Sequence, residues 1–328
     1  MRLGLYVNPQ GGTDESATEL FEGTLELARA ASEAGFDHLS AGQHYLSSFQ
    51  QLQLLPFLSR LTAELSGMEI ATGIVLLPFH HPVDLAERIA TLDTFHDGRT
   101  ILGVGAGYRN VEFEAFGVPR RERVPRLVEG LELTERLLTE RDVSYDGEFY
   151  SVDGVTIPNR LEEIETWMAA NADPAVERAA RMTDAWFINP HATIGEIRTQ
   201  KRDCYDPIRL ERGLDTSVPV TREAFVAESR SEAIETAREY LWEKYQTYID
   251  WGQDEAMEDE RDLHRPFEEL AADRFVLGTP TEVCAEIERY EEELDASHVV
   301  FRTHWPGLPY EDAIENVELF GDEVIPNV

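Results

Sequence analysis

The chain repeats one unit, a short apolar strand followed by an amphipathic helix, from its first residues to its last. Apolar residues run together over strand lengths and then recur at helical spacing, which is typical of parallel strands joined by crossover helices. The predicted strands lie at eight places: 3–7, 38–42, 69–76, 100–105, 165–169, 185–188, 218–227 and 297–302. The predicted helices between them include about 82–95, 123–139, 193–213 and 231–247, and the residues 279–282 predict a capping box at the start of another helix. Eight such units predict an α/β fold, a (β/α)8 TIM barrel that forms a single domain over residues 1–328.

Two segments interrupt the repeat. Residues 142–157 alternate in polarity around Asp146-Gly147, which predicts an inserted β-hairpin. Residues 248–275 are acidic and irregular and predict a long loop, either a solvated loop or a lid. A doubly wound open sheet is the rival fold, but the G-x-G-x-x-G motif expected after its first strand is missing.

The charge of the chain restricts its partners. The sequence has 29 Lys+Arg against 64 Asp+Glu, a formal charge of −35, which argues against nucleic-acid and anionic-membrane partners. Only two of the basic residues are lysine, Lys201 and Lys244. This composition resembles proteins of salt-loving archaea, in which salt screens the repulsion between carboxylates; a merely acidic protein is the alternative.

The N-terminus, the apolar runs and the cysteines indicate where the protein resides and which sites it lacks. The N-terminus does not resemble a signal peptide, and the longest apolar run is too short to span a membrane. We therefore expect a cytoplasmic protein, in a high-salt archaeal cytoplasm. Cys204 and Cys284 form no C-x-x-C motif, which argues against a disulfide framework and a cysteine-rich zinc site.

The active site of a barrel lies at the carboxyl ends of its strands. His44 follows the second strand and is the candidate acid–base residue, a loop histidine bonded to a backbone carbonyl being the alternative. The turn after the fourth strand brings backbone close to a flat or phosphorylated ligand, or is simply tight: Gly105, Ala106, Gly107 and Tyr108. Arg109 is expected to face the mouth, while its charged neighbours, Glu112 among them, are interpreted as ion-paired surface.

Further candidates follow the later strands. The turn Asn171–Asp173, with Asp173 as N-cap, offers free N–H groups to a phosphate, as does the helix start at 278–281. Trp186 and His304 are candidate substrate or anion contacts. No metal site is expected, because the adjacent His80 and His81 point apart and have no acidic or cysteine partner at ligand spacing.

Several blocks of the sequence resemble the bacterial luciferase-like family of flavin- or F420-dependent oxidoreductases. They occur in the family's order at 70–82, 86–93, 98–108, 112–117, 171–187 and 278–283. The resemblance implies a homodimeric barrel that holds reduced FMN or coenzyme F420, with His44 near the reactive ring. It also implies a non-prolyl cis bond at Gly73–Ile74 behind that ring.

The resemblance also implies that the turns Gly105–Tyr108 and Asn171–Asp173 hold the ribityl chain and phosphate. One departure concerns Ala169-Ala170, where many members have two glycines, and another concerns Ala185, where they have a glycine. These alanines add methyl groups near the expected cofactor.

The predicted function is therefore a luciferase-like oxidoreductase or monooxygenase that acts on an unidentified small organic substrate. A non-catalytic flavin- or F420-binding protein is the alternative. A barrel isomerase or aldolase is a third hypothesis, disfavoured because neither lysine falls at a strand end.

Overall fold

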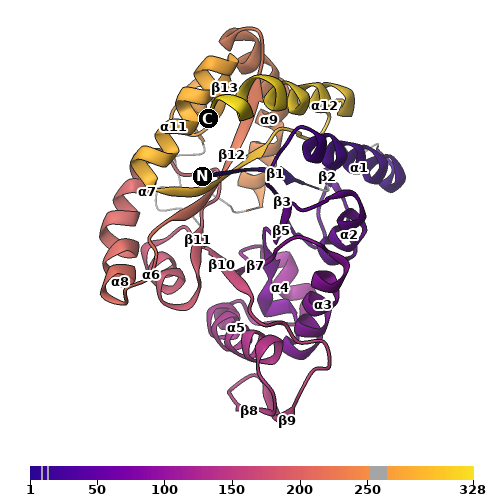
Figure 1. The fold of residues 1–328 in the computed structure, drawn as a ribbon, viewed down its shortest axis with the longest axis vertical. Helices are drawn as coiled ribbons and strands as arrows, with labels where there is room; N and C mark the ends of the chain where they lie inside the picture. The colour runs from indigo at the N-terminus through magenta and orange to yellow at the C-terminus, as the bar shows by residue number, and fades with distance from the viewer. Residues whose placement is uncertain (9, 13–14, 252–263) are drawn as a thin grey trace.

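The structure is a computed structural model that describes residues 1–8, 10–12, 15–251 and 264–328 (Figure 1). Parallel strands occupy the centre and helices surround them. The eight main strands are β1 (Arg2–Val7), β3 (His38–Ala41), β5 (Glu69–Thr72), β7 (Thr100–Gly105), β10 (Glu165–Ala169), β11 (Ala185–Phe187), β12 (Val218–Val226) and β14 (Ala296–Arg302).

The strands form a ring. Each pairs in parallel with its neighbour in the order β11-β10-β7-β5-β3-β1-β14-β12. An isolated parallel bridge between Ile188 and Val220 then joins the end of β11 to β12 and closes the circle. The predicted (β/α)8 barrel is confirmed. A short extra strand, β13 (Val276–Gly278), pairs with the carboxyl end of β12.

Helices cover the outside of the ring. They are α1 (Ala17–Glu33), α2 (Leu54–Leu61), α3 (Pro82–Phe95), α5 (Arg123–Thr139), α6 (Asp173–Met182), α7 (Ile194–Gln200), α8 (Asp206–Glu211), α9 (Arg230–Asp250), α11 (Pro280–Leu294) and α12 (Tyr310–Leu319). Their starts follow local chemistry. Pro82 is the first residue of α3, and Thr279 with Glu282 forms the predicted capping box of α11.

Shorter helices and strands lie in the loops of the barrel. They are α4 (Asn110–Phe116), α10 (Phe267–Ala271), β2 (Gln10–Gly11), β4 (Gln50–Gln51) and β6 (Val75–Leu76). The predicted hairpin is confirmed as the antiparallel pair β8 (Val143–Asp146) and β9 (Ser151–Val155). It projects from the rim beside α5 (Figure 1).

Three predicted elements differ from the structure in detail. The third strand breaks after Thr72, because the peptide bond Gly73–Ile74 is cis, as the resemblance implied, and pairing resumes at β6. The helix predicted over 193–213 is α7 and α8 joined by a π-helical turn at Lys201–Tyr205, ahead of the helix-breaking Pro207. Asp173 is not the N-cap of α6: Ala172 is, and Asp173 is the first helical residue.

The acidic segment is more regular than predicted. α9 continues to Asp250 because Tyr245 and Tyr248 bury their rings, and α10 and β13 order residues beyond 266. Residues 252–263 of this prediction lie outside the described part of the chain. Within the described part, no helix combines the length and apolar character that crossing a bilayer requires.

Two apolar clusters hold the barrel together. The large one lies between the ring and the surrounding helices. The small one fills the inside of the ring with side chains from six of its strands: Tyr6, Ala71, Ile101, Trp167, Ala185, Phe187 and Val300. Because strand side chains alternate between the two faces, residues two positions from these also point inward.

Candidate functional site

His44 stands where the sequence predicts, directly after β3 at the carboxyl end of the ring. Its side chain is 18% exposed, and its Nδ1 lies 3.3 Å from Glu112 Oε1. The carboxylate of Glu112 is fully buried and sits in the first turn of α4. A buried carboxylate on one ring nitrogen fixes the orientation of an imidazole and leaves Nε2 free to exchange a proton.

Two other groups hold Glu112 in place. Its Oε1 accepts hydrogen bonds from the backbone N–H of Tyr45 at 2.8 Å and from Arg109 Nη1 at 3.3 Å. Glu112 is ion-paired, as interpreted, since Arg109 lies 3.3 Å from its Oε1, but its placement on the surface is wrong because the carboxylate is buried. Glu112 lies in the first turn of α4, after the turn that follows β7, and its carboxylate is directed inward. Only the structure shows that His44 and Arg109 meet it there.

Arg109 is also placed differently from the expectation that it faces the mouth. Its guanidinium is buried and donates to the carbonyls of Tyr45 at 2.6 Å and Leu46 at 3.2 Å. Its Cζ lies 4.0 Å from the centre of the Trp251 ring. Arg109 therefore supports the loop after β3 rather than presenting a free cation to a ligand.

Aromatic rings surround His44. Ring centres of Tyr108, Tyr248 and Trp251 lie 5.9, 6.3 and 5.4 Å from its imidazole, all edge to face. Tyr108 Oη is buried without a hydrogen-bond partner among the described residues, and burial raises the pKa of Tyr108 well above its ordinary value. Sequence reasoning missed Tyr248 and Trp251, because the end of α9 was interpreted as part of an irregular acidic loop.

Side chains from two neighbouring parts of the barrel hold the segment that contains the cis bond. The Tyr6 hydroxyl donates to the carbonyl of Gly73, and the Leu76 N–H donates to Gln43 Oε1 at 3.0 Å. Ile74 packs into the space above Gly105, where a Cβ would overlap its side chain. A larger residue at Gly105 would therefore force the Ile74 side chain to shift.

Within the turn after β7, the backbone of Gly107 is left-handed, with φ +71°. A residue with a side chain rarely adopts this conformation, so the tight-turn interpretation holds at Gly107. Ala106 packs against the large apolar cluster, and the turn then delivers Tyr108 to the His44 side of the mouth.

A side chain of α7 holds the turn after β10. Gln200 Nε2 of α7 donates to the Asn171 carbonyl at 2.7 Å and to Asp173 Oδ1 at 3.0 Å. Ala169 lies next to Gly105, with its Cβ 3.8 Å from where a Cβ on that glycine would stand. The turns Gly105–Tyr108 and Ala169–Asp173 are thus neighbours at the mouth, as the sequence analysis expected of a shared site.

Two predicted contacts are not directed at the mouth. Trp186 is 1% exposed, donates to the Ala170 carbonyl at 2.9 Å, and packs against Tyr205 between the ring and the helices. His304 is buried on Tyr310, with Nε2 3.0 Å from the Leu308 carbonyl, and burial lowers the pKa of His304 to about 4. Both residues stabilise the walls of the barrel.

A cavity of about 410 Å³ opens beside the same end of the barrel. Residues from the loops after β1, β3 and β14 and from α9 line it: Gly12, Glu15, Phe49, Glu243, Lys244 and 306–310. Lys244 is paired with the buried Glu223 at 2.6 Å, and burial lowers the pKa of Lys244 to about 7. The cavity has room for a small organic molecule.

The histidines considered for a metal point apart, as expected. His80 Nε2 lies 3.3 Å from both Gln43 Oε1 and Tyr45 Oη. His81 instead caps α3, its Nδ1 accepting from the N–H of Val83 at 3.3 Å.

Comparison with known proteins extends this picture. An F420-dependent glucose-6-phosphate dehydrogenase of Nakamurella multipartita is 26% identical over 321 residues, which cover 92% of this chain and 91% of that protein. The structure of a monooxygenase from Streptomyces bottropensis superposes with a TM-score of 0.88 at 24% identity, over 99% of both chains.

A third structure is similar in fold. The oxygenating constituent of 3,6-diketocamphane monooxygenase from Pseudomonas putida, in complex with FMN, superposes with a TM-score of 0.80 at 19% identity, over 100% of this chain and 99% of that one. Residues 1–297 match the luciferase-like monooxygenase family. With the closed barrel and the cis bond at Gly73–Ile74 that the resemblance implied, this match establishes that the chain belongs to the luciferase-like monooxygenase family.

Proposed function

We propose that this protein is an oxidoreductase that binds reduced FMN or coenzyme F420 at the carboxyl end of its barrel and acts on a small organic substrate. One observation carries the proposal: an imidazole, His44, is held by the buried carboxylate of Glu112 at the mouth of the ring. Among its relatives are an F420-dependent dehydrogenase and an FMN-containing monooxygenase, which supports both cofactors.

The residues at the mouth fit a flat heterocycle with polar edges. Tyr108 offers a buried hydroxyl that has no partner in the described chain. Gly107 has a left-handed backbone and no side chain, so its peptide groups are open to a ligand. The turns Gly105–Tyr108 and Asn171–Asp173 would hold the ribityl chain and phosphate, and Gly73–Ile74 would back the ring. The methyl groups of Ala169 and Ala170 narrow this space.

A reduced flavin activates O₂ and a reduced deazaflavin donates a hydride, so the cofactor supplies the redox chemistry. The contribution of the chain is to position and to move a proton. Glu112 orients the ring of His44, and Nε2 of His44 exchanges a proton with the substrate. Tyr108, Tyr248 and Trp251 exclude water from this exchange, since their rings surround the imidazole.

The test combines cofactor binding with turnover. The protein, purified in molar KCl, is titrated with FMN and with F420 under reducing conditions, and bound cofactor is then mixed with alcohols and ketones, with and without O₂. We expect saturable binding of one cofactor and its reoxidation or consumption by substrate. His44→Asn should lower turnover by about 100-fold with little change in cofactor Kd.

His81→Asn is the matched control, because asparagine also caps a helix and the ring of His81 contacts Tyr150 and the start of α3. Binding of a cofactor without turnover for any substrate would favour the non-catalytic alternative. Binding of neither cofactor would overturn the proposal.

We also propose that the protein is a homodimer, that it resides in a salt-rich archaeal cytoplasm, and that it has no nucleic-acid or membrane partner. The net charge of −35 and the near absence of lysine support this setting. Sedimentation in molar KCl tests the dimer directly, since a monomer there would contradict it.

A further inference from the structure

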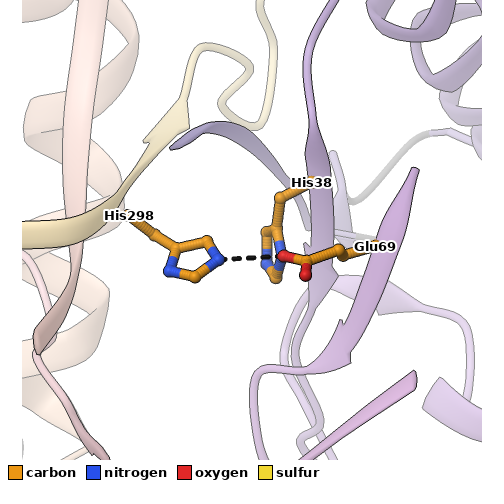
Figure 2. Close-up of side chains that lie close together, drawn as sticks. All are labelled: His38, Glu69 and His298. Atoms are coloured by element: carbon orange, nitrogen blue, oxygen red, sulfur yellow. Dashed lines mark hydrogen bonds and ion pairs between the residues drawn. The ribbon is translucent and has the colours of Figure 1, made fainter. Parts of the chain in front are cut away.

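Three metal-binding side chains meet at the end of the barrel opposite His44 (Figure 2). His38 and Glu69 are the first residues of β3 and β5 and lie opposite each other in the sheet register. His298 comes from β14, on the other side of β1. Glu69 and His298 lie two residues before the inward-facing Ala71 and Val300, so both point into the ring. His38 points there as well, since its ring stacks on the inward-facing Trp167.

The distances suit one ion. His298 Nε2 lies 2.9 Å from Glu69 Oε2, and His38 Nδ1 lies 3.7 Å from the same oxygen. All three candidate ligand atoms lie within 4.8 Å of one another. Tetrahedral Zn²⁺ with bonds of about 2.0–2.1 Å separates its ligand atoms by about 3.4 Å, a value between the two measured distances.

The far nitrogens of both imidazoles are already engaged. His38 Nε2 is 2.5 Å from Ser40 Oγ, and His298 Nδ1 is 3.0 Å from Ser297 Oγ. Hydrogen bonds of this kind fix the tautomer of a metal-bound histidine. They leave His38 Nδ1, on a completely buried side chain, without a hydrogen-bond partner among the described residues and directed at Glu69.

The surroundings enclose both histidines, whose side chains are buried. The indole of Trp167 stacks on His38 at 5.4 Å and meets His298 edge-on at 5.0 Å. Gly4 leaves room for the ring, since a Cβ there would lie 2.8 Å from His38 Cδ2.

Charges of both signs lie around Glu69. Its Oε1 pairs with Arg2 and with Arg99, the latter at 3.4 Å, while Oε2 faces the histidines. Both arginines are about half exposed, so solvent screens their repulsion of a cation, and Glu165 pairs with Arg99. Glu69 therefore has one oxygen for the arginines and one for a metal.

We propose that His38, Glu69 and His298 bind one divalent transition-metal ion, such as Zn²⁺, in a buried site that ties β14 to β3 and β5. A set of two imidazoles and one carboxylate suits zinc, cobalt and related ions. Because binding requires the folded ring, the ion stabilises the barrel. The site stands apart from the proposed catalytic mouth, and the sequence analysis expected no metal.

The experiment uses the tag-free full-length chain, stripped with a chelator and titrated with Co²⁺ in excess Mg²⁺. We expect one Co²⁺ per chain with the strong visible absorption of a four-coordinate site, displacement by Zn²⁺, and a raised Tm. His298→Gln should weaken Co²⁺ binding by at least about 10-fold. Glu69→Gln, which keeps the side-chain shape, serves if the first variant does not fold.

His96→Gln is the matched control, because His96 is also buried and bonds its Nε2 to the Met68 carbonyl outside the cluster. It should retain full Co²⁺ binding. Only weak, six-coordinate absorption in the unmodified chain, or equal binding by His298→Gln, would overturn the proposal.

Discussion

At the scale of single residues, the proposed chemistry depends on the contact between Glu112 and His44. The carboxylate reaches the imidazole, the Tyr45 N–H and Arg109 at once, so it couples three parts of the mouth. Glu112 is a positioning residue in this arrangement, since it acts through His44.

Glu112→Gln tests this role. Glutamine keeps an oxygen for Tyr45 and Arg109 but removes the charge beside His44, so we expect kcat to fall by roughly 10- to 100-fold while cofactor Kd stays within a factor of two. Glu114→Gln, on the exposed side of the same helix, should leave both unchanged. Partial recovery in Glu112→Asp would separate positioning from a general loss of folding, whereas an unchanged kcat in Glu112→Gln would contradict the role.

The sequence predicted part of this site. His44 is identifiable because it directly follows a strand, and the turn at Gly105–Tyr108 is identifiable from its glycines. Glu112 was not identifiable: alternating Arg and Glu after a strand look like solvated ion pairs, and periodicity does not reveal that a seven-residue helix turns one of them inward.

At the scale of elements, the third strand and the neighbouring strand β7 approach each other closely where the third strand breaks. Thr72 Oγ1 accepts from the Gly103 N–H and donates to the Gly103 carbonyl, both at 2.8 Å. A Cβ at Gly103 would overlap the Thr72 carbonyl, which is backbone and cannot rotate away.

Gly103→Ala should therefore lower the free energy of unfolding by about 1–3 kcal/mol, measured by denaturant titration. Gly195→Ala is the control, because nothing lies within 4 Å of a Cβ there and alanine favours a helix. Equal stability of the two variants would show that β5 and β7 tolerate a wider spacing.

Element boundaries were predictable where local chemistry marks them. The bounds of α3 and α5 agree with the approximate bounds that the sequence predicts, and Pro82 marks the start of α3. The end of α9 was missed, because its acidic residues suggested a loop, whereas burial of Tyr245 and Tyr248 extends the helix. Tertiary packing here outweighs the local signal.

At the scale of the whole molecule, we expect the charge of −35 to make the stability of the fold depend on the salt concentration. At low salt the carboxylates repel one another over a Debye length of about 30 Å, and at 1 M this falls to about 3 Å. We expect Tm to rise by several degrees between about 0.1 and 2 M KCl, followed by circular dichroism. An equal rise in sucrose, which is excluded from surfaces without screening charge, would argue against this cause.

The ring itself was predictable from eight strand–helix units, but what it encloses was not. Residues 38, 69 and 298 belong to no motif and meet only because β14 returns beside β1. The positions of these three residues in the sequence therefore do not predict that their side chains meet.

The closure between β11 and β12 has a consequence for how the barrel moves. β11 has three residues, and two backbone hydrogen bonds join Ile188 to β12, from its N–H to the Pro219 carbonyl and from the Thr221 N–H to its own carbonyl. Every other junction of the circle has more residues in register. We therefore expect the barrel to open most readily at this seam, so that in a hydrogen-exchange measurement the amide protons of Ile188 and Thr221 exchange with solvent ahead of those elsewhere in the ring.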